Sequence, residues 1–183
     1  MYGLIVVLTM LAPCSIVFAR ELTGPAKVIS TDTLEIRGTS VQLWGIDAPD
    51  ETQTCRYFNG DPYQCGLRAA SDLQSFIAER EVSCLSVLEE GTMATCSVDG
   101  IDLGEWLVRN GLALERYPRR RYDHAQGAAE RAGLGVWAGS FAVPWLYRKC
   151  ICLGGRPASC SDDTNAHLLE RHSPHQNKCV DRE

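Results

Sequence analysis

The stretch VQLWGIDAP, residues 41–49, decides how the fold is interpreted. It begins as a strand, because residues 41–46 combine β-branched and aromatic side chains. The strand pattern breaks at Asp47, and Pro49 removes a backbone hydrogen-bond donor there. Asp50 and Glu51 follow directly. The stretch therefore predicts a strand that ends in an acidic loop.

Patterns on both sides of this stretch extend the assignment. Alternation of apolar and polar residues predicts strands, and apolar residues on one face of a 3.6-residue period predict helices. The expected strands are 26–29, 33–36, 41–46, 82–87 and 93–98, and the expected helices are 64–80, 103–110 (capped by Asp102 and ended by Gly111) and 122–132. Five main strands with one long helix between the third and the fourth are typical of the OB-fold. The expected class is a β-barrel with helices (α+β), namely a five-stranded antiparallel OB-fold barrel plus three helices.

Composition limits the domain count and the function class. The chain has 183 residues, 45% of them hydrophobic and 22% charged, with a formal net charge of −5. These values exclude wholesale disorder and argue against coating of nucleic acid by bulk charge. We expect one domain over residues 20–147. A tail over 148–183 follows, which holds four cysteines and three of the four histidines but few large apolar residues.

The amino-terminal segment and the cysteine content predict export. Residues 4–11 and 15–18 are apolar, and Val17-Phe18-Ala19 suits signal peptidase, so we expect a signal peptide over 1–19. An uncleaved membrane anchor is the alternative. The chain has nine cysteines, and cleavage would remove Cys14 and leave an even number. The expected location is secreted or periplasmic, with no stable membrane insertion after cleavage.

The cysteine spacing predicts disulfides. Cys55 and Cys65 bracket a loop, and Cys84 and Cys96 lie on neighbouring expected strands. In the tail, a bridge between Cys150 and Cys152 would be strained, which leaves two pairings for the set Cys150, Cys152, Cys160 and Cys179. The alternative for the tail is a zinc site that these cysteines share with His167, His172 and His175.

Several short motifs together resemble one nuclease family. They are Asp32-Thr33, the element 45–49, Val98-Asp99-Gly100, residues 106–113 and residues 135–139. In order and spacing these resemble the staphylococcal-nuclease-like (thermonuclease) family over roughly residues 22–147. The resemblance implies an OB-fold and calcium-dependent hydrolysis of phosphodiester bonds. The exported, cysteine-bearing form with a tail also resembles rhizobial proteins encoded among succinoglycan (exopolysaccharide) biosynthesis genes.

The family resemblance assigns roles to individual positions. Asp32 and Asp47 stand at the positions of the calcium-binding carboxylates, and Ala48 stands where a backbone carbonyl completes the site. Asp50 stands at the position of the general-base glutamate, with Glu51 beside it as a substitute. For Asp32 and Asp47, capping of a turn is the alternative role.

The two phosphate-binding arginines of the family are replaced in this chain. Gln42 stands at the first position, and Glu89-Glu90-Gly91 stands at the second. Loss of one preorganised donor to a developing oxyanion costs about 10²–10³ in rate. Arg109, Arg116 and the run 119–121 are the replacements that the chain offers, without positional support from the sequence.

The segment from Arg116 to Tyr122 interleaves basic and aromatic residues. Arg116, Tyr117 and Arg119 are therefore candidate ligands for a nucleic acid or an anionic polysaccharide, and a solvated loop is the alternative. The leading hypothesis for the whole chain is an exported thermonuclease-like protein whose phosphodiesterase activity is lost or strongly weakened. It would act as a binding or accessory module linked to exopolysaccharide biosynthesis. The alternative is an active calcium-dependent nuclease that cleaves DNA or RNA.

Overall fold

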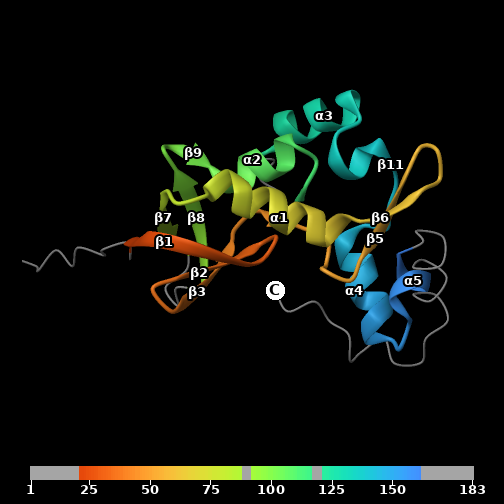
Figure 1. Ribbon diagram of the computed structural model, residues 1–183, viewed down its shortest axis with the longest axis horizontal. Coiled ribbons are helices and arrows are strands. Elements are labelled where there is room, and N and C mark those ends of the chain that lie inside the picture. Colours follow the sequence, from red (N-terminus) through yellow and green to blue (C-terminus); the bar gives the residue numbers. More distant parts are fainter. Residues whose placement is uncertain (1–20, 88–91, 117–120, 162–183) are drawn as a thin grey trace, which may run out of the picture.

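The computed structural model describes residues 21–87, 92–116 and 121–161 (Figure 1). The expected signal peptide 1–19 and the segment 89–91 lie outside these residues. The strands are β1 (Glu21–Ser30), β2 (Thr33–Ile36), β3 (Thr39–Leu43), β4 (Ile46–Asp47), β5 (Thr54–Tyr57), β6 (Pro62–Gln64), β7 (Glu81–Ser86), β8 (Met93–Val98), β9 (Ile101–Asp102), β10 (Leu114–Glu115) and β11 (Gly139–Ser140). The helices are α1 (Cys65–Ile77), α2 (Leu103–Arg109), α3 (Asp123–Ala132), the 3₁₀ helix η1 (Gly135–Ala138), α4 (Pro144–Cys152) and α5 (Pro157–Cys160).

Five strands close into a barrel. β1 pairs with β2 and β7, β2 pairs with β3, and β7 pairs with β8, all antiparallel. The last pair, β3 with β8, is parallel and joins Gln42 to Met93 and Leu43 to Ala94. The prediction of a wholly antiparallel barrel was therefore wrong in this one pair. The reason is topological, because directions cannot alternate around a closed ring with an odd number of strands.

The core of the barrel follows the sequence pattern closely. Leu34, Ile36, Val41 and Leu43 alternate with exposed or half-buried neighbours along β2 and β3 and are almost fully buried. Helix α1 turns its apolar face, which includes Leu73, toward the same core and crosses the front of the molecule in Figure 1. The period-two and period-3.6 patterns thus specified which faces are buried.

Helix α2 begins and ends at the residues that the sequence indicated. Asp102 accepts a hydrogen bond from the backbone N–H of Glu105 at 3.0 Å, so it is the N-cap. Gly111 follows the helix with φ of 65°, a left-handed conformation that glycine adopts without steric cost. These two signals are local, which is why the sequence located them.

The carboxyl-terminal part of the described chain contains more helix than expected. Helix α4 crosses position 147, where the domain was expected to end, and α5 follows it. Both lie at one end of the molecule beside β5 and β6 (Figure 1). They form a second small core of buried residues, namely Ala142, Leu146, Tyr147, Cys150 and Cys160. The sequence pattern missed these helices because the apolar residues are few and the segments are short.

Three disulfides link described residues. Cys55–Cys65 and Cys84–Cys96 confirm the two pairs expected in the domain. Cys150–Cys160 belongs to one of the two tail pairings that the sequence left open, and Cys152 is also disulfide-bonded. Since zinc binds cysteine as a thiolate and disulfide-bonded sulfur is not a thiolate, these three tail cysteines cannot serve as zinc ligands. Cys179 and the histidines His167, His172 and His175 lie outside the described residues.

Within residues 21–87, 92–116 and 121–161, no helix is long and apolar enough to cross a bilayer.

Candidate functional site

Asp47 lies at the inner end of the acidic loop and is almost completely buried. The two-residue strand β4 places it, because β4 pairs with β10 and sets Asp47 opposite Leu114. Its side chain is only 3% exposed. A carboxylate held at this depth requires compensating partners, since burial of an unpaired charge costs several kcal/mol.

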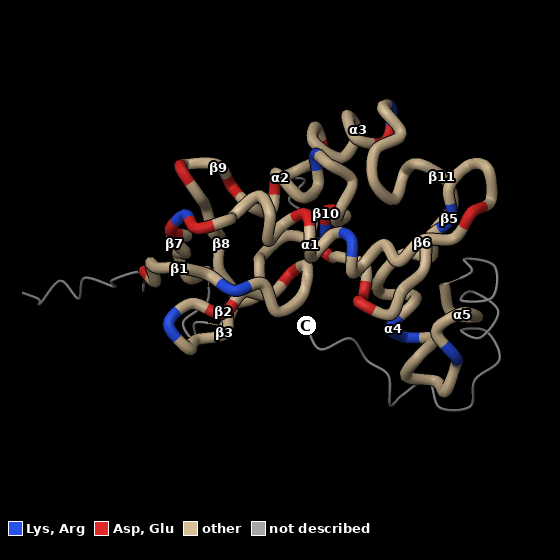
Figure 2. The backbone as a smooth tube through the Cα atoms, in the orientation of Figure 1, with Lys and Arg blue, Asp and Glu red and all other residues tan. Residues whose placement is uncertain are grey.

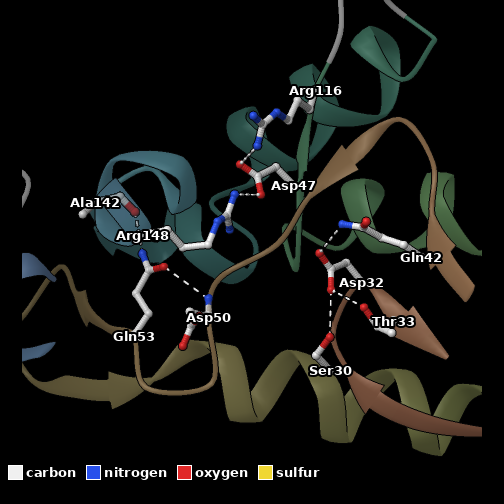
Figure 3. Close-up of polar contacts among 10 residues, drawn as sticks. All are labelled: Ser30, Asp32, Thr33, Gln42, Asp47, Asp50, Gln53, Arg116, Ala142 and Arg148. Atoms are coloured by element: carbon white, nitrogen blue, oxygen red, sulfur yellow. Dashed lines mark hydrogen bonds and ion pairs between the residues drawn. The ribbon is translucent and has the colours of Figure 1, made fainter. Parts of the chain in front are cut away.

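Two arginines supply that compensation. Arg148 Nη2 lies 2.6 Å from Asp47 Oδ1, and Arg116 Nη1 lies 3.3 Å from Asp47 Oδ2. They approach the carboxylate from two directions, so each oxygen faces its own guanidinium (Figure 3). Burial raises the pKa of the Asp47 carboxyl, while the charges of Arg148 and Arg116 oppose this rise. The ion pairs thus offset part of the burial cost.

Arg116 reaches Asp47 through the strand pairing itself. It directly follows β10, and its backbone N–H donates to the carbonyl of Gly45 at 3.0 Å, just before β4. The sequence predicted Arg116 as a ligand-binding residue, and the structure places it against the expected metal carboxylate. Tyr117 and Arg119, the other two predicted ligand-binding residues, lie outside the described part of the chain.

Arg148 reaches Asp47 because helix α4 docks on the acidic loop. Gln53, which is fully buried, donates from Nε2 to the carbonyl of Ala142 at 2.5 Å. The hydroxyls of Thr52 and Tyr147 lie 2.7 Å apart. These contacts join the loop to the segment just before α4 and to Tyr147 within it, the residue that precedes Arg148. No motif or spacing in the sequence points to Arg148.

The Cys150–Cys160 disulfide holds the same helix from its other end, and this gives a testable expectation. Replacing both cysteines with serine should lower the free energy of unfolding by about 2–4 kcal/mol, because the unfolded chain regains loop freedom. Thermal denaturation by circular dichroism measures the loss. An unchanged melting temperature would contradict a structural role for this bridge.

Asp32 lies in the turn between β1 and β2. Oδ1 accepts hydrogen bonds from the hydroxyls of Ser30 at 2.8 Å and Thr33 at 3.0 Å. Oδ2 lies 3.4 Å from Nε2 of Gln42 (Figure 3). Asp32 is near enough to Asp47 for its charge to contribute to the rise in pKa of that carboxyl. The structure thus brings together the two expected metal carboxylates and the Gln42 position.

Asp50 belongs to the same loop but is held differently. Its Oδ1 accepts from the backbone N–H of Thr52 at 3.1 Å and from the Thr52 hydroxyl at 2.9 Å. In Figure 3 its carboxylate points away from Asp47. Glu51 is exposed, and Ala48 is buried next to Asp47. The expected base position is therefore engaged in a local turn.

The loop rests directly on the first turn of α1. Gly66 has no side chain, and a Cβ there would lie 1.9 Å from the carbonyl oxygen of Asp50. The Thr31 hydroxyl also donates to the Gly66 carbonyl at 3.1 Å. This close backbone contact fixes how deep the acidic loop lies against the barrel.

The fit of calcium to this site can be judged from the donors. Calcium binds several oxygen ligands at once. Both oxygens of Asp47 are paired with arginines, and those of Asp32 accept hydrogen bonds from neighbouring side chains. Within the described residues, no group of three or more histidine, cysteine, aspartate or glutamate side chains could hold a metal ion. The residues therefore do not fit a calcium ion in this arrangement.

Comparison with known proteins identifies a relative of this chain. The chain is 37% identical over 126 residues to the succinoglycan biosynthesis protein ExoI of Rhizobium meliloti (strain 1021), which confirms the expected kinship with rhizobial proteins of that kind. The match covers 65% of this chain and 66% of the relative, just under two thirds of its length. No protein-family model matches the chain.

Proposed function

We propose that this chain is an exported, thermonuclease-like binding or accessory protein of exopolysaccharide biosynthesis, whose phosphodiesterase activity is lost or strongly weakened. One observation carries the loss of activity. Both oxygens of the buried Asp47 carboxylate face a guanidinium, one from Arg148 and one from Arg116. A nuclease of this type would need that carboxylate for its metal ion.

The positive charges around Asp47 act against a divalent cation. At about 4 Å, two unit charges interact by about 1 kcal/mol in water and more where the surroundings exclude water. A calcium ion would have to displace Arg148 from Asp47 or tolerate its repulsion. Within the described residues, no cluster of three or more acidic, histidine or cysteine side chains is present to offset that repulsion and hold the ion.

The expected base also argues for weak chemistry. Activation of water requires a carboxylate within hydrogen-bond reach of that water. Asp50 is held in a turn by Thr52, and its carboxylate points away from Asp47. Gln42 offers a neutral donor where a charged one would stabilise a phosphate about twice as strongly.

The accessory role and the exported location have separate support. The relative in Rhizobium meliloti is named a succinoglycan biosynthesis protein, and we extend this link to the present chain. Three disulfides between described residues are typical of proteins from an oxidising compartment.

A second candidate function has one observation in its favour. Arg116 and Arg148 bring guanidinium groups to the expected metal carboxylate, although the chain has no arginine at the two positions where the family carries its phosphate-binding arginines. If both turned toward a bound phosphate, the chain would be an active calcium-dependent nuclease with replacement residues. Calcium would then be its cofactor and a nucleic acid its substrate.

A nuclease assay separates the two functions. We expect purified protein to show no calcium-dependent cleavage of DNA or RNA, and no rise in melting temperature with calcium, because Asp47 is already paired. Cleavage and thermal denaturation are measured with calcium and again with chelator. An active calcium-dependent nuclease serves as the positive control.

The variants make a positive result interpretable. Asp47→Ala removes the buried carboxylate, and Asp61→Ala removes an exposed one in the β5–β6 hairpin as a matched control. Calcium-dependent cleavage that is lost in the first variant and kept in the second would overturn the proposed function and establish the nuclease.

A further inference from the structure

A cleft separate from the Asp47 site lies between helices α1 and α2. It has a volume of about 480 Å³, within the range of small-molecule sites. Its lining includes Arg68, Asp72, Ser75 and Phe76 from α1, and Trp106 and Asn110 from α2 and its end. None of the residues that contact Asp47 lines it. The function proposed above makes no use of this cleft.

Two stacked aromatic rings form part of its wall. The centroids of Phe76 and Trp106 lie 4.2 Å apart, with 15° between the ring planes. Both side chains are only half-buried. Arg80 lies over the Phe76 ring, with its Cζ 4.8 Å from the centroid. The aromatic surface is thereby held in place by packing rather than left to rotate freely.

Polar groups surround these rings on both sides. Asp72 and Arg68 stand on α1 and form a loose ion pair, with Nε and Oδ2 3.8 Å apart. Across the cleft, Asn110 donates from Nδ2 to the carbonyl of Trp106 at 2.7 Å, so its amide is held in one orientation. Amide, carboxylate and guanidinium groups are planar, and each carries two atoms that can form hydrogen bonds at the same time. Such a group can therefore bind two neighbouring hydroxyls of a sugar.

The far wall of the cleft is rigid. Gly111 and Gly135 approach so closely that a Cβ on Gly135 would lie 2.0 Å from the carbonyl oxygen of Gly111. Val136 donates its backbone N–H to that same carbonyl at 2.9 Å. The cleft therefore exists before any ligand binds, which lowers the entropy cost of binding.

A second aromatic stack continues from the cleft. Tyr57 and Tyr63 stack with centroids 4.3 Å apart, and the Tyr63 hydroxyl donates to the carbonyl of Gly135 at 2.9 Å. Arg68, which lines the cleft, also contacts this second stack, because its Nη1 donates to the Tyr57 hydroxyl at 2.7 Å. The second stack thus supports the lining residues Arg68 and Gly135 from behind and helps to fix their positions.

We propose that this cleft binds an oligosaccharide of flat pyranose rings, such as β-linked glucose. The C–H face of such a ring would pack on Trp106, because the Phe76 ring is already covered by Trp106 and Arg80, and the equatorial hydroxyls would reach the surrounding amide and charged groups. The inference rests on the proposed function in one respect, since it names the ligand class of a binding protein. It does not depend on the state of Asp47.

The charge of the cleft favours a sugar over a nucleic acid. Single strands bind where a positively charged groove follows the phosphates and bases stack on aromatic rings. Here the positive Arg68 is matched by the negative Asp72. Acidic and basic residues are also interspersed along the described chain (Figure 2).

The test uses cellohexaose as the probe, with titration calorimetry and tryptophan fluorescence on the purified exported protein. We expect saturable binding that Trp106→Ala weakens about tenfold or more and Asp72→Ala weakens by about threefold to tenfold. Trp44→Ala and Asp61→Ala are matched controls outside the cleft and should leave affinity within about twofold. If Trp106→Ala fails to fold, Trp106→Phe takes its place: binding seen by calorimetry without the fluorescence change of the parent supports the cleft, and an unaltered fluorescence change overturns it.

Each outcome decides the inference. Absence of saturable binding, or affinity unchanged by the Trp106 and Asp72 variants, overturns the oligosaccharide cleft. Binding of a single-stranded oligonucleotide in place of cellohexaose, lost in the same variants, also overturns it. Neither of these results bears on the proposed loss of nuclease activity. Calcium-dependent cleavage would refute that proposed function, whether or not cellohexaose binds.

Discussion

Replacement of Gly66 with alanine is expected to lower the free energy of unfolding by about 3 kcal/mol or more. The added Cβ would lie 1.9 Å from the carbonyl oxygen of Asp50, and the obstructing atom belongs to the backbone. No rotamer change can relieve that overlap, so the acidic loop or the start of α1 must move. Thermal denaturation should show a melting temperature lower by roughly 10 °C.

A matched glycine controls for the general effect of the substitution. In Gly127→Ala the new Cβ would meet only the tip of the flexible Arg131 side chain, at 3.1 Å. Because Gly127 lies inside helix α3, alanine there should stabilise the helix by about 0.5–1 kcal/mol. Equal stability of the two variants would show that the loop does not rest on α1 as described.

Replacement of Arg148 with methionine is the second large expected effect. It leaves the buried Asp47 carboxylate with Arg116 alone. Removal of one partner from a buried ion pair costs about 3–5 kcal/mol, but the Arg148 side chain is 35% exposed and water screens part of the interaction. We therefore expect a loss of about 1–3 kcal/mol, measured by urea or thermal denaturation.

Two further variants separate charge from packing. Arg148→Lys keeps the charge but loses the planar fork, so its stability should lie between those of the parent and the methionine variant. Arg156→Met changes an exposed arginine in the loop between α4 and α5, and the stability of this variant should remain within about 0.5 kcal/mol of the parent. A methionine variant at 148 as stable as the parent would mean that Arg148 does not compensate Asp47.

The sequence predicted those parts of the fold that depend on short-range patterns. The alternation around Leu34 and Val41 identified the strands, and Asp102 with Gly111 marked the ends of α2. The parallel pairing of β3 with β8 was missed because pairing across the barrel leaves no local signal in either strand. Such pairings are set by the whole topology rather than by neighbouring residues.

The candidate site was predictable to a similar degree. Motif spacing predicted that Asp32 and Asp47 share one site, and the structure places them near enough for the charge of Asp32 to act on Asp47. Arg148 could not be found, since it lies 101 residues from Asp47 in a segment whose composition suggested little structure. The only available signal was the apolar triplet around Trp145, Leu146 and Tyr147, which allows a short docking helix.

That long separation has a consequence for the order of folding. Contacts between distant residues form late, because the intervening chain must first lose its freedom. The barrel and the pairing of β4 with β10 can form before α4 docks, and Asp47 then lies in a buried position with Arg116 as its partner and without Arg148. Maturation of the protein should therefore end with the seating of α4, and a chain truncated before that helix would retain a poorly neutralised acid at its centre.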